Sequence, residues 1–274
     1  MLGSVPLDAS EGPAVGSAQV VRLAEVARLS VTATARGSKG GIPLFDARGG
    51  QEVPAADPDA LYRDRESRAS AVRAADIWSA RLDHDPRDFE SAWKLARARY
   101  WLGTHGLPEA DRKAALELGV AAGRTAAALE PGRPEGHFWM AANMGALAES
   151  FGLRQGIRYR GAIKEALETV LALDRGFQYG SADRALGRWY FEVPRLFGGS
   201  DRKSEEHLRQ ALSYNEDSII TRVFLAETLW ALGRKDEARA ELRTALAAPL
   251  DPEWAPEDRH FKAQAEQLLQ RYAR

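Results

Sequence analysis

From residue 59 to its end, this sequence shows helical periodicity almost without interruption, and no alternating apolar–polar strand pattern breaks it. Turn residues divide the stretch at short intervals, for example at Asp85-Pro86, Pro131-Gly132 and Gly198-Gly199. Helices joined by such short links pack against their neighbours in sequence. We therefore predict an all-α chain, with helices over residues 59–82, 88–102, 108–129, 134–151, 159–173, 181–194, 201–214, 218–232, 235–247 and 256–272.

A recurring order of bulky and small residues relates these helices to one another. It is clearest in residues 219–251, which contain Leu225-Ala226, Leu229, Ala238, Leu242 and Ala245. The order returns at Leu186-Gly187, Tyr190, Ser204, Leu208 and Ala211, and more loosely upstream. Small residues are needed where two helices cross closely, and bulky ones fill the space between successive hairpins. These positions match tetratricopeptide repeats, so we predict an α-solenoid of about four to five helical hairpins, with residues 256–272 as a C-terminal capping helix.

The first part of the chain has a different composition. Glycine and proline recur there too often for a long helix, as at Gly40-Gly41, Pro43, Gly49-Gly50 and Pro54. We predict that residues 1–58 form a Gly/Pro-rich arm, extended or partly disordered, and that residues 59–274 form the helical-repeat domain.

Charge and cysteine content exclude several functions. The 274 residues carry 38 basic and 39 acidic side chains, a formal net charge of −1, which does not suit a protein that holds nucleic acid by its phosphates. The chain has no cysteine, so disulfides, thiolate metal sites and a cysteine nucleophile are excluded. The histidines are scattered, and neither a nucleophile-elbow motif nor a phosphate-binding loop is present. We expect no enzymatic activity, no catalytic residue, no cofactor and no metal.

The sequence contains no apolar run near the roughly 18–20 residues that a membrane helix requires, so we expect no transmembrane segment. The most apolar early stretch, 20–31, is interrupted by Arg22, Glu25 and Arg28. Although Ala33-Thr34-Ala35 resembles a signal-peptidase site, neither a typical signal peptide nor a lipobox cysteine is visible.

The strongest candidate for a site is the concave surface of the solenoid. The first helix of each pair lines this groove, and the repeat register places nine side chains on it: Lys94, Trp101, Trp139, Asn143, Arg184, Arg188, Phe191, Glu227 and Trp230. Arginine and amide donors suit a carboxylate, and tryptophans supply apolar walls. The groove is therefore a candidate site for an organic anion or a peptide segment. The alternative is that the tryptophans fill the space between helices and the arginines pair with acidic neighbours.

Two segments carry a family resemblance, residues 136–150 (GHFWMAANMGALAES) and 184–199 (RALGRWYFEVPRLFGG). Together with residues 224–227 (FLAE) and 255–258 (APED), they closely resemble the T component of TRAP transporters, a bacterial tetratricopeptide family. More distantly, the chain resembles the regulators of microtubule dynamics, whose helical repeats carry a similar Leu-Gly-Arg-Trp run. The resemblance covers residues 59 to the C-terminus.

The resemblance implies a periplasmic or otherwise exported, non-enzymatic protein that works beside the solute-binding protein of a TRAP system. It also implies self-association into a homo-oligomer and a cleft or pore. Our first hypothesis is a helical-repeat binding or scaffold protein that holds an anionic solute or a partner segment in its groove. The alternative is a self-assembling structural protein in which the N-terminal arm straps neighbouring subunits.

Overall fold

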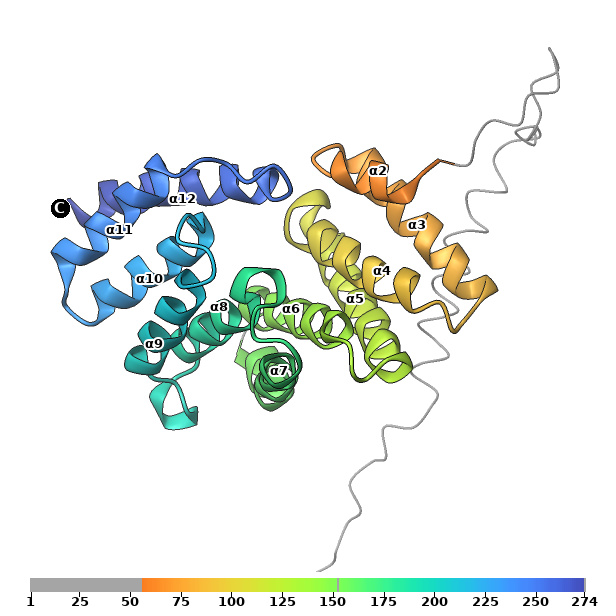
Figure 1. Ribbon diagram of the computed structural model, residues 1–274, viewed down its shortest axis with the longest axis horizontal. Coiled ribbons are helices and arrows are strands. Elements are labelled where there is room, and N and C mark those ends of the chain that lie inside the picture. The colour runs from red at the N-terminus through yellow and green to blue at the C-terminus, as the bar shows by residue number, and fades with distance from the viewer. Residues whose placement is uncertain (1–55, 152, 274) are drawn as a thin grey trace, which may run out of the picture. The chain divides into compact units, whose positions relative to one another are not determined.

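The computed structural model describes residues 56–151 and 153–273, and these contain eleven α-helices and no strand (Figure 1). The α-helices are α2 (Pro58–Arg63), α3 (Arg68–His84), α4 (Phe89–Trp101), α5 (Glu109–Leu129), α6 (Pro134–Ser150), α7 (Leu153–Leu173), α8 (Phe177–Glu192), α9 (Asp201–Leu212), α10 (Ile219–Ala231), α11 (Lys235–Ala247) and α12 (Ala255–Tyr272). A π-helical turn, η1 (Leu102–Gly106), follows α4, and a 3₁₀ turn, η2 (Arg195–Phe197), follows α8. The all-α class and the α-solenoid are confirmed. The predictions for residues 1–55 of the arm lie outside the described residues.

Side-chain caps fix several of the helix starts. The Asp88 carboxylate accepts the backbone N–H of Ser91 at 2.9 Å and begins α4, and Ser200 caps α9 in the same way. The predicted helix over residues 59–82 is in fact two helices, because Ser67 caps a new start and the turn at residues 64–67 separates α2 from α3. This turn carries Arg65.

The small residues of the repeat lie where the helices approach most closely. A Cβ on Gly187 of α8 would be 2.5 Å from Leu208 Cγ of α9, so this crossing admits no side chain. Ala226, Ala238 and Ala245 are fully buried within the hairpin of α10 and α11. The small residues of the repeat pattern therefore mark the positions where two helices cross.

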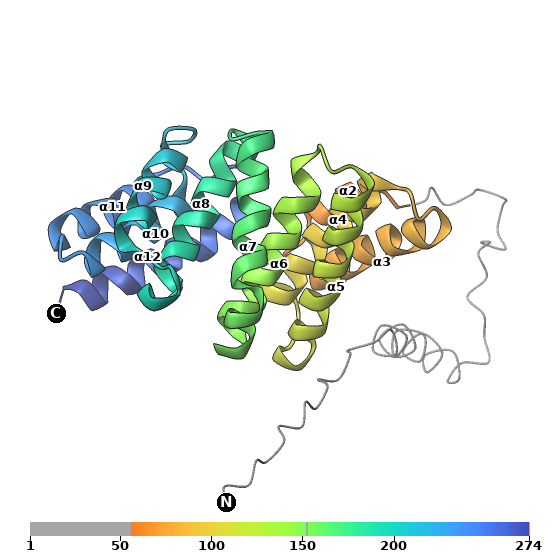
Figure 2. The ribbon, with the colours of Figure 1, turned by 90° about the horizontal axis from the view of Figure 1, so that it is seen from below.

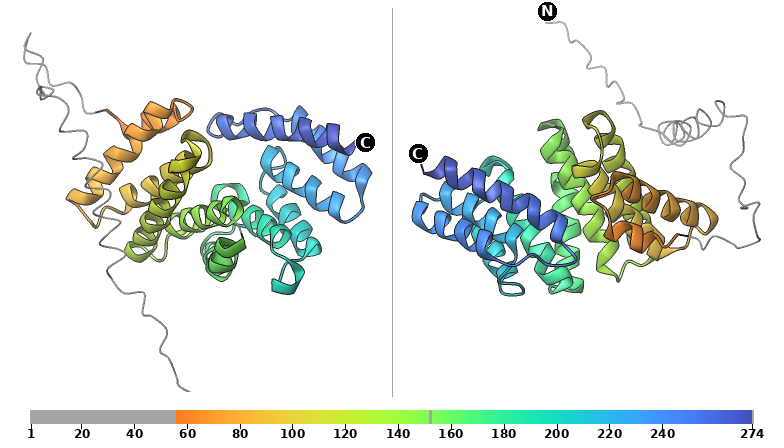
Figure 3. Two further views of the ribbon diagram at one scale, coloured as in Figure 1. Left: turned by 180° about the vertical axis from the view of Figure 1, so that it is seen from behind. Right: turned by 90° about the horizontal axis from the view of Figure 1, so that it is seen from above.

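The apolar interior consists of two main clusters. The larger is built mainly from α3 to α8, and the second joins α9, α10, α11 and α12. Helices α5, α6 and α7 lie side by side in Figure 2. Figures 1 and 3 show the helices following a curved path that brings α12 back beside α2 and α3. Residues near the two ends of the described chain therefore meet.

Helix α8 begins earlier than its periodicity predicts, and its first turn is irregular. Gln178, Tyr179 and Gly180 all have left-handed backbone angles, with φ of 45°, 56° and 74°. A Cβ on Gly180 would be 2.8 Å from the Tyr214 ring, so this turn passes very close to the end of α9. Left-handed residues other than glycine are costly and often occur at binding sites, which makes this turn notable.

Candidate functional site

The helices enclose a cavity of about 930 Å³. Its walls come from α6, α7 and α8 on one side and from the start of α12 with the loop before it on the other. Three of the nine predicted groove residues line it, namely Trp139, Arg184 and Arg188. A cavity of this size fits the range of small-molecule sites in proteins.

Two cations of this cavity, Arg160 and Arg184, have no ion pair with any described residue. The Arg160 guanidinium lies over the Phe197 ring, whereas no described aromatic ring holds that of Arg184. Among the residues that the structure describes, none forms an ion pair or a side-chain hydrogen bond with its guanidinium. Burial lowers the pKa of Arg184 to about 10, and this effect is opposed by Tyr100 and Asp258. The guanidinium remains charged at neutral pH. A largely buried, charged and unpaired group is unfavourable unless something binds it, so Arg184 is suited to receive an anion.

Arg188 lies one helical turn further along α8 and is fully paired. Its guanidinium contacts the carboxylates of Glu149 at 3.4 Å, Glu192 at 2.7 Å and Glu227 at 2.9 Å. Burial raises the pKa of Glu149 and of Glu227, while Arg188 opposes that rise. Three carboxylates already share this cation, so Arg188 has little attraction left for an added anion.

Trp139 supplies an apolar surface to the cavity, and its indole donor is unpaired. Its side chain is only 3% exposed, it lines the cavity, and its indole Nε1 has no hydrogen-bond partner among the described residues. Its ring centroid lies 5.8 Å from that of Tyr100, another wall residue and one of the two groups that act on Arg184. Because this N–H is buried behind the cavity surface, Trp139 contributes its apolar ring to the wall, and the Arg184 guanidinium supplies a donor to a ligand in the cavity.

Asn143 lies in the interior and does not line the cavity. Its side-chain amide donates to the Ala96 carbonyl at 3.0 Å and to the Trp139 carbonyl at 2.7 Å, and the residue is fully buried. These bonds tie α6 to α4 and hold the backbone beneath Trp139. Asn143 therefore supports the wall residue Trp139 from the interior side, away from the cavity.

The other five predicted residues are dispersed over the fold. Lys94 pairs with Asp59 at 3.0 Å, and the Trp101 indole donates to the Arg65 carbonyl at 2.7 Å. Phe191 lies beneath the Arg188 guanidinium, and Glu227 is one of its partners. Trp230 stacks on Tyr272, with ring centroids 3.7 Å apart. None of these five lines the cavity of Arg184.

The sequence prediction missed the wall that α12 contributes. Trp254, Glu257, Asp258 and His260 line the cavity, and so do the left-handed residues Gln178 and Tyr179 at the start of α8. The Gln178 side-chain oxygen is buried without a hydrogen-bond partner in the described part of the chain. The repeat register predicts contacts between neighbouring hairpins only. It does not predict where a capping helix lies relative to distant hairpins, so it could not predict this wall. The segment at residues 255–258, which carries part of the family resemblance, was the available signal.

No group of three or more metal-ligating side chains occurs within residues 56–151 and 153–273. Likewise, none of the helices in this part of the chain is both long and apolar enough to cross a membrane.

Comparison with solved structures supports the class of protein. The chain is similar to a tetratricopeptide-repeat protein of Thermus thermophilus, with a TM-score of 0.58 and 23% identity over 77% of this chain and 97% of that chain. The MamA structure matches with a TM-score of 0.47 and 18% identity over 77% of this chain and 98% of that one. The first comparison shows the fold, which is that of a helical-repeat protein. No curated protein gives a significant match.

Two family models match overlapping halves of the chain. Residues 134–274 match the model of the TRAP transporter T-component, and residues 56–197 match that of regulator of microtubule dynamics protein 1-3. The chain belongs to the TRAP transporter T-component family, and its N-terminal repeats also carry the pattern of the second model. Members of these groups are helical-repeat proteins of the non-enzymatic kind.

Proposed function

We propose that this protein is a non-enzymatic binding protein that holds a small organic anion in the cavity beside Arg184. The observation that carries the proposal is the guanidinium of Arg184, which is largely buried, charged and unpaired within the described residues. The Trp139 ring and apolar residues of α6 and α7 supply an apolar part of the wall beside it. A carboxylate or sulfonate joined to an apolar body matches this combination.

The experiment is a titration with octanoate, benzoate and anilinonaphthalene sulfonate, a dye whose fluorescence rises when it leaves water. Replacing a charge-assisted contact costs about 1.5–3 kcal/mol, so Arg184→Met should weaken binding by about tenfold or more. Arg209→Met is the matched control, because Arg209 is exposed on α9 and outside the cavity. Absence of binding to the wild type, or equal affinity of the Arg184→Met variant, would contradict the proposal.

A second candidate function is docking of a partner protein at the mouth of the cavity. Apolar side chains are exposed there: Ile157, Tyr179 and Phe197 line the cavity, and Leu196 beside them is 88% exposed. Membership in the T-component family suggests the solute-binding protein of a TRAP transporter as the partner, and a periplasmic location with it. Association of the two purified proteins should weaken in the Leu196→Ser variant. Equal association of both forms would count against this surface.

Self-association into a homo-oligomer is a further part of the proposal. Light scattering of the full chain and of a chain starting at Asp59 tests it together with the role of the arm. A monomeric mass for both would exclude the arm as a strap between subunits.

A further inference from the structure

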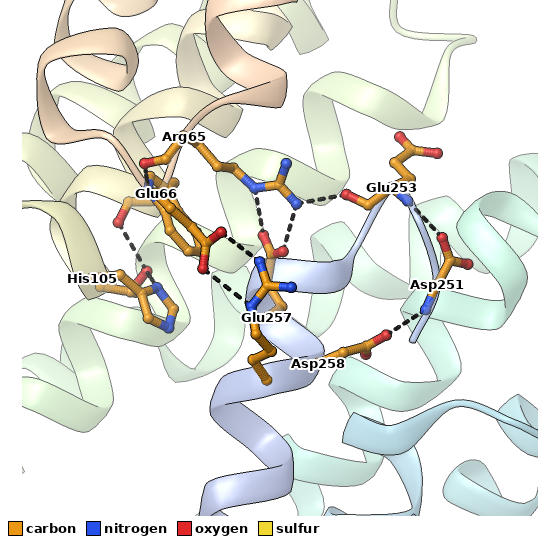
Figure 4. A network of polar contacts seen from close by, with 10 residues as sticks. Arg65, Glu66, His105, Asp251, Glu253, Glu257 and Asp258 are labelled. Carbon is orange, nitrogen blue, oxygen red and sulfur yellow. Dashed lines mark hydrogen bonds and ion pairs between the residues drawn. The ribbon is translucent and has the colours of Figure 1, made fainter. Parts of the chain in front are cut away.

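The start of α12 meets the turn between α2 and α3 at a seam that closes the curved path of the helices (Figure 4). Arg65 and Glu257, which meet there, are 192 positions apart in sequence. The contacts join the turn after α2 and the turn η1 to the start of α12, and they are mostly between side chains. We call this set, Arg65, Glu66, His105, Glu257, Arg259 and His260, the clasp.

Arg65 is the centre of the clasp. Its guanidinium donates to both oxygens of Glu257, at 3.0 Å and 2.5 Å, and to the Glu253 carbonyl at 2.6 Å. It also lies over the rings of Tyr62, Trp101 and Trp254. With its side chain only 4% exposed, Arg65 is held by a bidentate, largely desolvated pair.

Two further contacts flank this pair. Arg259 of α12 forms an ion pair with Glu66, and both side chains are about half exposed. The ring of His260 packs edge-on against that of His105 in η1, with centroids 4.9 Å apart. The His105 ring in turn stacks on Trp101, at 4.4 Å.

The packing of α12 elsewhere is of a different kind. Its apolar face, with Ala265, Leu268 and Tyr272, belongs to the cluster of α9, α10 and α11. Within the described residues, the apolar link between this part and the N-terminal cluster across the seam is Trp254, just before α12. The two ion pairs, the edge-on contact of His260 with His105 and the Trp254 side chain therefore hold the seam closed. Such a contact can break without loss of either core.

Two of the three clasp residues of α12 also belong to the wall of the cavity that Arg184 lines. Glu257 and His260 line the cavity, as does Trp254 just before them. Their distance from Arg184 thus depends on whether the seam is closed. Opening the seam would carry the α12 wall away from the α8 wall and leave Arg184 exposed to water.

We propose that the clasp is a closing device for the cavity, in which Arg65 and Glu257 act as positioning residues that complete the binding site when α12 is docked on α2 and α3. This proposal deepens the proposed function and rests on it for the ligand, but the closure itself is a property of the protein alone. With the clasp closed, the cavity binds the anion with high affinity. With the clasp open, the anion can pass between the cavity and solvent.

The first measurement follows the seam directly and uses no ligand. The chain has no cysteine, so spin labels placed at Ala69→Cys on α3 and Glu266→Cys on α12, both exposed, report the distance across the seam. The Glu257→Gln variant should give a longer and broader distance distribution than the parent. Lys164→Gln, which breaks a solvent-accessible ion pair on α7, is the matched control and should leave the distances unchanged.

A charge exchange separates attraction across the seam from a general loss of structure. Glu66→Arg alone should widen the seam, and adding Arg259→Glu should restore it, because the pair is re-formed with reversed charges. Circular dichroism confirms that each variant remains helical. An unchanged distance in both Glu257→Gln and Glu66→Arg would overturn the proposal.

The second measurement is the affinity for anilinonaphthalene sulfonate in the same variants. We expect affinity to fall about three- to fivefold in Glu66→Arg and to return in the exchanged pair. A seam that opens with no change in affinity would overturn the positioning role. If the wild type does not bind the dye, the proposed function fails, whereas the label distances still decide whether the clasp opens.

Discussion

Two places where helices meet in this molecule are built in opposite ways: the crossing of α5 with α6, and the clasp. At the crossing, a Cβ on Gly123 would be 2.7 Å from the Met140 backbone N, and one on Gly136 would be 2.4 Å from that of Ala127. The backbones themselves are in contact there, so the crossing has no room to adjust. At the clasp, long side chains bridge the gap by charge. The comparison indicates that one half of the cavity wall is fixed and that the other can move.

The largest expected effect comes from adding one methyl group at the crossing. Gly136→Ala would push a Cβ into the α5 backbone and should lower the free energy of unfolding by about 1–3 kcal/mol. Urea unfolding followed by circular dichroism measures this.

Gly145→Ala, on the same helix, is the matched control. A Cβ there meets nothing within 4 Å, so the gain in helix propensity should stabilise the protein by about 0.5–1 kcal/mol. Equal effects of the two substitutions would show that the close approach at Gly136 does not limit the crossing.

A somewhat smaller effect is expected from Asn143→Ala, beside the crossing. The Ala96 and Trp139 carbonyls would lose the side-chain donor but keep the backbone N–H of their own helices, so the loss should be that of ordinary hydrogen bonds, about 0.5–1.5 kcal/mol. Unfolding free energy should fall while dye affinity stays close to that of the wild type. Arg184→Met should show the reverse pattern, with weak binding and undiminished stability. A variant of Asn143 that folds stably yet fails to bind would instead make this amide a ligand contact.

The smallest expected effect is a loss of clasp closure as the pH falls. Burial, together with His260, Arg112 and Arg65, lowers the pKa of His105 in the closed form to about 4, from an ordinary value of 6.5. The open form therefore takes up a proton first, so the part of the closure energy that His105 contributes is lost as pH falls from 6.5 towards 4. The His105 side chain is nonetheless exposed by its accessible surface, which makes this contribution small.

Glu257 has a raised pKa, so its protonation favours the closed form as pH falls, which is opposite to the effect of His105. Because Glu257 is present in both proteins, comparing the wild type with His105→Gln isolates the contribution of His105. Spin-label distances across the seam should widen more in the wild type than in the variant as pH falls through this range. Identical pH profiles would mean that His105 does not couple to closure.

Much of the fold could be predicted from the sequence, because it depends on local pattern. The spacing of Leu225, Ala226, Ala238 and Leu242 specifies a helical hairpin, and each of these four residues is fully buried as that pattern requires. The irregular elements escaped prediction for a physical reason. The left-handed turn at residues 178–180 packs closely against the end of α9, and a local pattern of residues does not predict a contact with another helix.

The candidate site could be predicted only in part. Of the residues that the repeat register puts on the concave face, Trp139, Arg184 and Arg188 line the cavity. The repeat register predicts which face of a helix a residue occupies. It does not predict which charged side chain pairs with that residue, or which helix lies across the cavity from it. Arg184 and Arg188 are four residues apart on one helix face. They differ because three glutamates come together around Arg188, and no described carboxylate reaches Arg184.

The sequence by itself determined that this chain forms helical hairpins stacked through small residues, because periodicity and residue size act between near neighbours. Only the tertiary structure decided that the ends of the repeat domain meet. That contact joins residues 192 positions apart, and its existence depends on the accumulated curvature of every hairpin between them. The cavity, its unpaired arginine and its clasp are products of that curvature.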